Sequence, residues 1–503
     1  MPEPILLHNT PKRSKELLAP ITSDAVRLYT CGPTVYNYLT VGNWVAFIRW
    51  DTLVRTLQCA GYTVNRVMNI TDVGHLTGEN EGDADQGEDK LEKGARRDGT
   101  TAWEVAQRYT DDFINGMQQL NLLPPEHLSK ATDYIAEQIT LVEKLESKGY
   151  TYTISDGVYF DTSKFPTYAD FARLDLEALQ EGARVTANPD KRNANDFALW
   201  KFTPANVTRD MQWESPWGIG FPGWHIECSA MAMSLLGETI DIHTGGIDHI
   251  PVHHTNEIAQ SEAASGKPFS HIWLHNAHLT VDGTKISKSL GNGYTLQDIE
   301  KKGYSALDLK MFVLQSHYRT ESNFSWTNLD GAKNRLSGWR RVASARWTMA
   351  PPKEKWQTLA LDAKQKLQDK VDGMVDEVML SDMHKALRDD LDTPEALRII
   401  DAQLAVMRML VSSNRISPEG ITRFFSTIDK ALGLNIIKST PNIPKAAQKL
   451  LDERQAQLDA LSSKQSTDWS VSDAQRARLA NEFNLGVSET NVDGRKRQTW
   501  YWL

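Results

Sequence analysis

The beginning of the chain alternates strand-like and helix-like patterns, and this alternation restricts the possible folds more than any other feature. Residues 26–30 form a short β-prone run that ends at the turn Cys31-Gly32-Pro33. Apolar residues then recur at helical spacing over residues 47–57, and residues 63–68 are β-prone again. A strand, a glycine-bearing turn, a helix and a second strand typically open a nucleotide-binding α/β domain. We therefore expect an α/β fold with a Rossmann-type core.

Length and composition indicate a soluble globular protein of several domains. The chain has 503 residues, of which 40% are hydrophobic and 24% are charged. No apolar run reaches the roughly 18 residues of a membrane span, and the first residues lack the pattern of a secretory signal. We expect a cytoplasmic monomer that does not contact a membrane.

The cysteines and the net charge exclude two further classes of protein. Only Cys31, Cys59 and Cys228 are present, and their odd number and wide spacing exclude a disulfide framework. A net charge of −9 argues against sequence-blind binding of nucleic acid, although local basic patches remain available for RNA.

From about residue 326 onward, helical periodicity dominates and strand signals nearly vanish.

A lysine-rich segment is the most specific local motif. Lys285-Ile286-Ser287-Lys288-Ser289 is followed by Leu290-Gly291-Asn292. Two lysines three residues apart in a flexible loop can stabilise the charge that grows on a departing pyrophosphate. A solvated surface loop explains the residues equally well when the motif is considered alone.

Metal-ligand chemistry is suggested by a second pair of residues. His253 and Glu257 are four residues apart, so a helix would place both side chains on one face, where they could share a metal ion. Spacing alone favours an ordinary surface pair, and Cys31 and Cys228 would more often be small buried side chains.

The acidic segment 78–89 fits a solvated loop better than a divalent-cation loop, because its spacing differs from that of an EF-hand.

Taken together, these segments resemble the cysteinyl-tRNA synthetases, a family of class I aminoacyl-tRNA synthetases. The resemblance is colinear from about residue 5 to Trp500 and includes the string Gly-Trp-His-Ile-Glu-Cys-Ser-Ala-Met within residues 221–231. The lysine-rich segment is similar to the family's KMSKS signature, with Ile286 in place of methionine. The other matching segments are residues 31–36, 69–72, 191–201, 243–257, 389–397 and 468–500.

The resemblance implies an activity and a metal site. The chain would activate L-cysteine with ATP and Mg²⁺ to cysteinyl-adenylate and transfer the cysteine to tRNA(Cys). One Zn²⁺ would select the substrate thiolate, and its ligands would be Cys31, Cys228, His253 and Glu257. Serine would coordinate poorly, so no editing domain would be needed.

The resemblance also assigns residues to the substrates. Thr71 and Trp224 would line the cysteine pocket, and His225, His243 and His254 would surround the metal. The residues implied for ATP binding and catalysis are Gly32, Gly42, Gly246, Asp248, Lys285, Lys288, Thr40 and Asn43.

One position departs from the family pattern. Thr40-Val41-Gly42-Asn43 stands where the family carries its HIGH signature, so Thr40 replaces the first histidine. Loss of one transition-state donor typically costs roughly 10²–10³ in rate. A slow enzyme, recruitment of another donor such as His75, and a non-catalytic tRNA-binding homologue are the alternatives. A related ligase that joins cysteine to an amino sugar is disfavoured, because such relatives lack the full C-terminal RNA-binding part.

The expected architecture is a class I catalytic core with an insertion, an α-helical domain and a small C-terminal RNA-binding domain. Basic and aromatic residues alternate between Lys333 and Trp347 and again between Arg495 and Trp502, and such side chains can bind phosphates and stack on unpaired bases. An ordinary basic helix face is the favoured interpretation of the first patch. For the tail, which resembles the family's anticodon-recognition region, RNA contact and a structural role are equally favoured. The expected parts are residues 1–115 and 216–275 as the two halves of the core, 116–215 as the insertion, 276–328 as the KMSKS-loop and stem-contact module, 329–440 as the helical bundle and 441–503 as the anticodon-binding domain.

Overall fold

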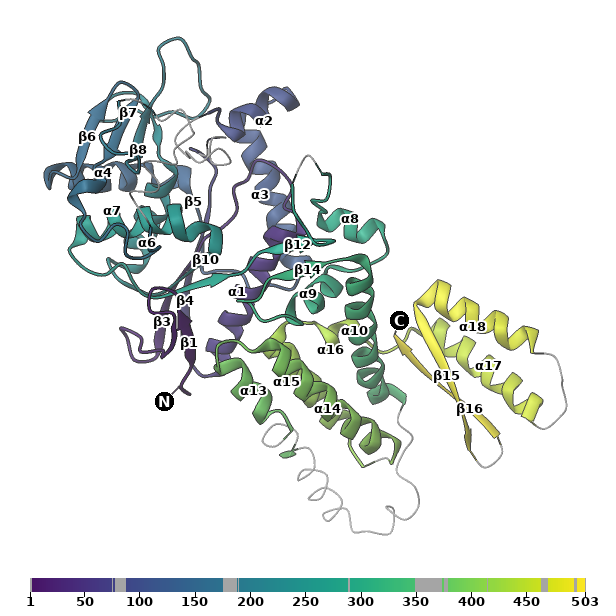
Figure 1. The fold of residues 1–503 in the computed structure, drawn as a ribbon. Coiled ribbons are helices and arrows are strands. Elements are labelled where there is room, and N and C mark those ends of the chain that lie inside the picture. The colour runs from purple at the N-terminus through teal and green to yellow at the C-terminus, as the bar shows by residue number, and fades with distance from the viewer. Residues whose placement is uncertain are drawn as a thin grey trace. The chain divides into compact units, whose positions relative to one another are not determined.

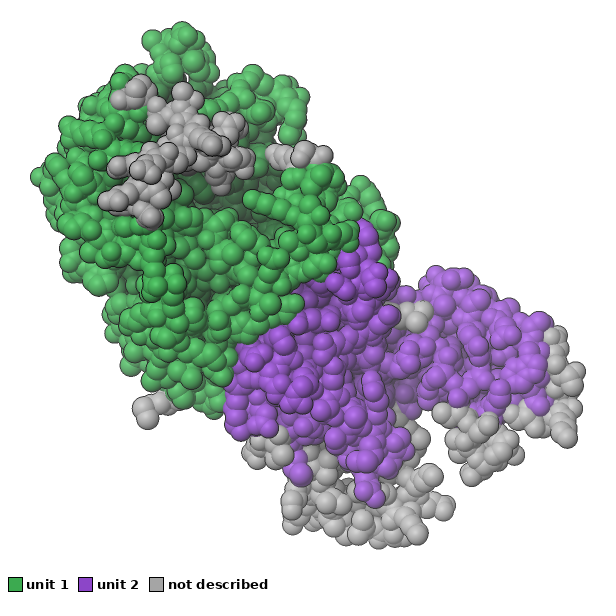
Figure 2. Space-filling model, in the orientation of Figure 1, with its two compact units in different colours: residues 1–306, 316–324, 388–391 green, residues 307–315, 325–387, 392–503 purple. Residues whose placement is uncertain are grey.

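The computed structural model describes residues 2–74, 76, 87–174, 188, 190–287, 290–348, 373–374, 379–413, 415–462, 469–492 and 495–502. The chain forms two compact units, which Figure 2 distinguishes by colour. Unit 1 comprises residues 1–306, 316–324 and 388–391, and unit 2 comprises residues 307–315, 325–387 and 392–503. The finer division into six parts stays a prediction.

A five-stranded parallel sheet in the order β11-β10-β3-β4-β5 forms the centre of unit 1 (Figure 1). The chain adds β4 and β5 on one side of β3 and later returns to β10 on the other side. In open α/β sheets, ligands bind at the carboxyl ends of the strands where the order reverses, here between β3 and β10. The α/β prediction is confirmed. The strands are β3 (Ala25–Thr30), β4 (Thr63–Ile70), β5 (His127–Lys130), β10 (Ile240–Gly246) and β11 (Ser270–Asn276).

Helix α1 (Val41–Cys59) connects β3 to β4. Its apolar residues, including Trp50, pack into the buried cluster beneath the sheet, as their helical spacing predicts. The helix begins before the apolar repeat does, because the Oδ1 atom of Asn43 accepts hydrogen bonds from the Thr40 N–H (3.0 Å) and the Thr40 hydroxyl (2.9 Å). Gly61, with φ of +96°, follows the end of the helix.

A second, antiparallel sheet in the order β6-β7-β8-β9 shares a core with three helices of unit 1. The sequence indicates β6 and β7, whereas β8 and β9 carry no alternating pattern because β8 is buried on both faces. The elements are β6 (Thr151–Ile154), β7 (Gly157–Phe160), β8 (Phe197–Phe202), β9 (Gly220–Pro222), α4 (Ile135–Ser147), α6 (Trp224–Leu236) and α7 (Thr255–Ser265).

Smaller elements complete unit 1. A three-stranded sheet in the order β13-β12-β14 carries the beginning of the lysine-rich segment on β13. The elements are β1 (Leu6–Asn9), β2 (Ser14–Leu17), α2 (Lys90–Asp98), α3 (Ala102–Gln119), η2 (Ala131–Tyr134), η3 (Thr162–Lys164), η4 (Ile247–His249), η5 (Ile250–His254), β12 (Leu279–Val281), β13 (Thr284–Lys285), α8 (Leu296–Lys301) and β14 (Ser322–Phe324).

Helices dominate unit 2, as the sequence predicts, but its end is a β-hairpin. Strands β15 (Leu485–Val492) and β16 (Arg495–Trp502) pair in antiparallel register, with Leu485 opposite Trp502. The prediction that strand signals nearly vanish after residue 326 is therefore wrong for this tail. The helices are α9 (Ala306–Leu314), α10 (Trp326–Thr348), α13 (Ser381–Arg388), α14 (Thr393–Ser412), α15 (Pro418–Leu432), α16 (Ile436–Ser439), α17 (Lys445–Ser462) and α18 (Ser470–Phe483).

A buried ion pair holds the hairpin to α17. The Arg454 side chain is fully buried and donates to the carboxylate of Glu489 on β15. Burial raises the pKa of Glu489, but hydrogen bonds from Arg454, Lys496 and Arg476 outweigh it and lower the pKa to about 2. Because the pKa is lowered in the folded state, this stabilisation is present above the ordinary glutamate pKa of about 4.3 and is lost as the pH falls toward 2.

We expect Glu489→Gln to lower the free energy of unfolding at pH 7 by about 2 kcal/mol, because it removes a charged acceptor from a buried guanidinium. Urea unfolding at pH 7 and pH 3 measures the free energy of unfolding. From pH 7 to pH 3 this free energy should fall less in the variant than in the wild type. Glu482→Gln on α18 is the control, because its pair with Arg478 is exposed. Equal acid sensitivity of the wild type and Glu489→Gln would contradict the assignment.

Candidate metal and substrate site

Four possible metal ligands converge at the carboxyl end of the central sheet. Cys31 directly follows β3, and its N–H donates to Thr244 on β10 (3.1 Å), at the point where the strand order reverses. Cys228 lies on α6, His253 on η5 and Glu257 on α7. One ligand atom of each of these four residues lies within 4.8 Å of the others. The structure therefore brings together all four residues that the resemblance implied.

The expected pairing of His253 and Glu257 is observed. Their Nε2 and Oε1 atoms are 3.0 Å apart, and the residues are four apart in the chain. His253 lies in the short π-helix η5, which continues directly into α7. Such turns occur frequently at functional sites. The turn and the helix together place both side chains on one side, as the spacing predicted.

The buried Glu257 carboxylate is better placed to coordinate a metal than to accept a hydrogen bond from the protein. Its oxygens lie 2.7 Å from His243 Nε2 and 3.0 Å from His253 Nε2, yet within the described part of the chain neither oxygen makes a hydrogen bond of acceptable geometry. Burial raises the pKa of Glu257, but the two histidines outweigh it and hold the pKa well below its usual range. A buried carboxylate that is ionised and poorly hydrogen-bonded is a suitable metal ligand.

The two thiols are also suited to a cation. Burial raises the pKa of Cys31, and the neighbouring Cys31 thiol together with burial raises the pKa of Cys228 well above its usual range. Zinc lowers the pKa of a thiol so that it coordinates as thiolate. The residues present therefore fit zinc in the chemistry of their donors and in their proximity.

An alternative set, Cys31, His243 and His254, is equally close together. Both ring nitrogens of His254 are already engaged, with Cys31 Sγ at 3.3 Å and His275 Nε2 at 2.7 Å. The four-residue set supplies the four donors of a tetrahedral zinc site, whereas the alternative set supplies three, so the four-residue set is the better candidate. His225 Nδ1 lies 3.0 Å from His253 Nδ1, so it can fix the orientation of that ring, as histidine partners of metal ligands commonly do.

Trp224 and Thr71 occupy positions consistent with a substrate pocket. Trp224 begins α6, and its ring centroid is 4.5 Å from that of His253. Thr71 directly follows β4 and is buried, and its hydroxyl accepts a hydrogen bond from Asn69 (2.9 Å). Thr71 also pairs with Thr34, just beyond Cys31.

The lysine-rich loop packs directly on the start of α1. A Cβ atom added to Gly42 would lie 2.7 Å from Ile286 Cδ1, so the Ile286 side chain would have to shift to admit it. The amide of Asn292 braces the loop by donating to the Lys285 carbonyl (3.2 Å) and accepting from Ser287 N–H (2.9 Å). The two segments that resemble the family's signatures are therefore adjacent. Lys288, His75 and residues 78–86 of the acidic segment lie outside the described residues.

The glycines implied for ATP binding lie at the same edge of the sheet. Gly32 follows β3, and its N–H donates to Asn69 Oδ1 (2.7 Å). A side chain on Gly32 would collide with the Asn69 carbonyl. Gly246 ends β10, and the exposed carboxylate of Asp248 follows on η4. Their roles stay predictions.

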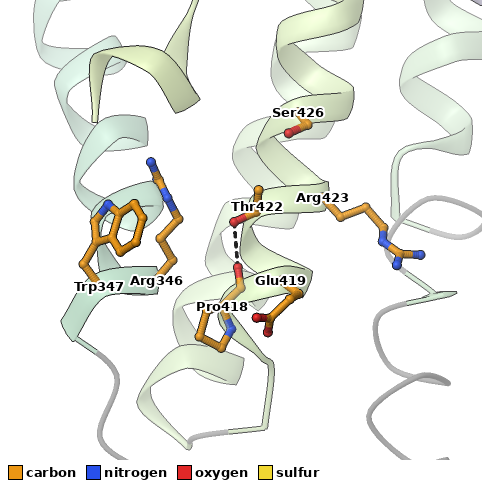
Figure 3. A pocket seen from close by; sticks show the side chains of 7 residues that line it. All are labelled: Arg346, Trp347, Pro418, Glu419, Thr422, Arg423 and Ser426. Atoms are coloured by element: carbon orange, nitrogen blue, oxygen red, sulfur yellow. Dashed lines mark hydrogen bonds between the residues drawn. The ribbon is translucent and has the colours of Figure 1, made fainter. Parts of the chain in front are cut away.

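Part of the first basic and aromatic patch is structural. Trp339 is buried and donates to Asp401 (2.8 Å), and Arg346 is buried and donates to Thr440 (2.9 Å). Arg346 and Trp347 of α10 face Pro418 across a cavity of about 400 Å³ in unit 2 (Figure 3). For Trp339 and Arg346 this agrees with the structural interpretation of the patch, because burial removes both side chains from the surface.

One buried residue beside the site, Glu227, was not predicted as a functional residue from the sequence. Glu227 lies between the motif residues Trp224 and Cys228, three residues after the first of them on α6. That spacing places it on the same face as Trp224, which was the available signal. Its complete burial could not be read from the sequence.

Among the described helices, none has both the length and the apolar character needed to span a bilayer.

Known proteins match the chain over most of its length. The family model described as tRNA synthetases class I (C) catalytic domain matches residues 17–334. "Cysteine--tRNA ligase 1" of Burkholderia lata is 40% identical, with 97% of this chain and 99% of the relative covered. "Cysteine--tRNA ligase" of Treponema denticola is 42% identical, with coverages of 87% and 88%. The structure of Mycobacterium tuberculosis methionyl-tRNA synthetase in complex with methionyl-adenylate has a TM-score of 0.52 at 15% identity over 86% of this chain and 94% of that chain, which shows the shared fold alone.

Proposed function

The chain belongs to the cysteinyl-tRNA synthetase family and is an ATP-dependent cysteine–tRNA ligase, and we propose that it selects cysteine with zinc held by Cys31, Cys228, His253 and Glu257. The observation that carries the proposal is the convergence of two thiols, an imidazole and a carboxylate within 4.8 Å of one another beside Trp224. When bound, zinc supplies an affinity for a thiolate that the hydroxyl of serine cannot match.

The reaction has two steps. The carboxylate of cysteine attacks the α-phosphorus of ATP, the bond from that phosphorus to the bridging oxygen breaks, and pyrophosphate leaves with its Mg²⁺. The oxygen of the terminal ribose hydroxyl of tRNA then attacks the adenylate carbonyl and loses its proton to water, the bond from that carbon to the phosphate oxygen breaks, and AMP leaves. Neither step needs a nucleophile from the protein, so positioning and charge stabilisation provide the catalysis.

Residues at the start of α1 and on the lysine-rich loop support the phosphate assignment. Lys285 is exposed on β13, and the loop that follows it packs on Gly42. Asn43 uses its Oδ1 atom to hold Thr40, which leaves its amide N–H groups as donors at the helix N-terminus. We assign Lys285 and Lys288 to the pyrophosphate, and Gly32, Gly246 and Asp248 to the nucleoside part of ATP.

The assignment is tested by charging a tRNA(Cys) transcript with the purified protein and measuring its zinc content in parallel. We expect cysteinyl-tRNA and one zinc ion per chain. Full charging by a protein that contains no zinc would exclude the proposed selection. Sedimentation tests the separate prediction that the protein is a monomer.

The substitution Thr40→His tests the departure from the HIGH pattern. We expect cysteine-dependent ATP–pyrophosphate exchange to rise about tenfold or more, because an imidazole adds a donor for the phosphates. The melting temperature should fall, because the α1 cap is lost, and Thr101→His at the N-cap of α3 should reproduce only that fall. An unchanged exchange rate would show that another donor already compensates, and no exchange in either protein would favour a non-catalytic tRNA-binding homologue.

A further inference from the structure

A fully buried carboxylate lies beside the metal ligands without a hydrogen bond. Glu227 is 0% exposed, and neither of its carboxylate oxygens finds a hydrogen-bond partner among the residues that the structure describes. A buried carboxylate without hydrogen bonds is energetically costly and is therefore rare without a functional reason.

The neighbouring carboxylates differ from Glu227 because they have partners. Asp72 accepts from the Thr132 N–H (3.0 Å) and hydroxyl (2.7 Å). Asp89 caps α2 and pairs with Arg209 at 2.5 Å. Of these three acidic groups, Glu227 is the one for which the described structure shows neither a salt bridge nor a hydrogen bond of acceptable geometry. Because both neighbours are acidic, the surroundings favour a positively charged ligand.

The position of Glu227 connects it to the amino-acid pocket. It lies on α6, three residues after Trp224 and directly before the ligand Cys228. The Thr71 hydroxyl and the His253 ring lie near its carboxylate. A Cβ atom added to Gly74 would lie 2.9 Å from Glu227 Oε1. Residues assigned to the substrate and to the metal therefore surround this carboxylate.

We propose that Glu227 binds the α-ammonium group of the substrate cysteine, a role that rests on the function proposed above. The ammonium group has three N–H donors and one positive charge, so it supplies what the carboxylate lacks. The same contact fixes the amino end of the substrate, leaving the cysteine carboxylate available for ATP. Glu227 is thus a binding and specificity residue, which discriminates against thiols that have no amino group.

The test compares two thiol ligands by calorimetry on the zinc-loaded, full-length protein. L-cysteine carries the ammonium group, and 3-mercaptopropanoate keeps the thiol and the carboxylate but lacks the ammonium group. In Glu227→Gln we expect the Kd of cysteine to rise about 10- to 100-fold, because a charged hydrogen bond is lost. The Kd of 3-mercaptopropanoate should change less than about twofold, since it never makes this contact.

Glu262→Gln is the matched control. Glu262 lies on the neighbouring helix α7, and burial raises its pKa too, but its Oε1 atom accepts from the Phe269 N–H (3.1 Å). This variant should bind both ligands as the wild type does. Equal weakening of both ligands in Glu227→Gln would indicate a merely structural role, and no weakening of either ligand would exclude the contact. Both results overturn the proposal.

The wild type provides a second, independent measurement. If Glu227→Gln does not fold, the wild type must still bind cysteine at least about ten times more tightly than 3-mercaptopropanoate, and equal affinities overturn the proposal. The proposed function is judged separately by cysteine-dependent ATP–pyrophosphate exchange in the wild type. Exchange together with equal affinities would reject the role of Glu227 alone, whereas absence of exchange would reject the function.

Discussion

Cys228→Ser is expected to remove zinc from the protein and to lower kcat/KM for cysteine activation by about 10³-fold or more. The Cys228 side chain is buried on α6 and converges with Cys31, His253 and Glu257. A hydroxyl coordinates zinc poorly, and without the metal the substrate thiolate loses its ligand, a loss we expect to cost about 4 kcal/mol or more at about 1.4 kcal/mol for each tenfold change. Metal analysis and ATP–pyrophosphate exchange on the same preparation measure both effects.

The matched control for this prediction is Cys59→Ser. Cys59 is the last residue of α1 and lies outside the cluster of four ligands, and its side chain is partly exposed. The control should keep full zinc content and full activity. If Cys228→Ser kept both as well, the four-ligand assignment would be wrong.

Lys285→Ala is expected to lower kcat of cysteinyl-adenylate formation about 10²- to 10³-fold while leaving the Kd of cysteine nearly unchanged. The side chain is exposed on β13, and the following loop packs on the start of α1. A cation there stabilises charge that appears on pyrophosphate only as the bond breaks, so its removal lowers the rate and not the affinity for cysteine. Stopped-flow measurement of adenylate formation separates the two quantities.

A lysine outside the loop provides the control for Lys285. Lys301 on α8 is highly exposed, and its distance of 3.9 Å from Asp298 marks a weak surface pair. Lys301→Ala should change neither kcat nor the Kd of cysteine. An effect of Lys285→Ala on the KM of ATP alone, with kcat retained, would show that the lysine binds the ground state and does not assist bond breaking.

The sequence predicts the core of unit 1 well because its signals are local. The helical spacing of apolar residues identifies α1, and the two β-prone runs beside it become adjacent parallel strands. The tail was not predicted, because β16 begins with Arg495-Lys496-Arg497, which has low strand propensity. Cross-strand packing of Val487 with Trp500 stabilises the hairpin, and such pairs cannot be read from one strand.

The site shows the same division between local and long-range information. Only the spacing of His253 and Glu257 predicts a shared ligand position from the residues themselves. Cys31 comes close to His253 and Glu257 because the strand order reverses between β3 and β10, and Cys228 comes close to them because α6 packs there. Neither arrangement can be read from the sequence, so only the resemblance to the family predicted that the four residues form one site. Glu227 was missed because its significance depends on burial and on the absence of a hydrogen bond in the described structure.

The most direct test of the account is cysteine-dependent ATP–pyrophosphate exchange by the zinc-loaded protein, with serine measured in parallel. Exchange with cysteine and none with serine is the predicted result, because we assign activation to the loop around Lys285 and discrimination to the four ligands. Exchange with both amino acids would contradict selection by a thiolate-binding metal. No exchange with either would contradict catalysis and identify Thr40 as the residue to change first.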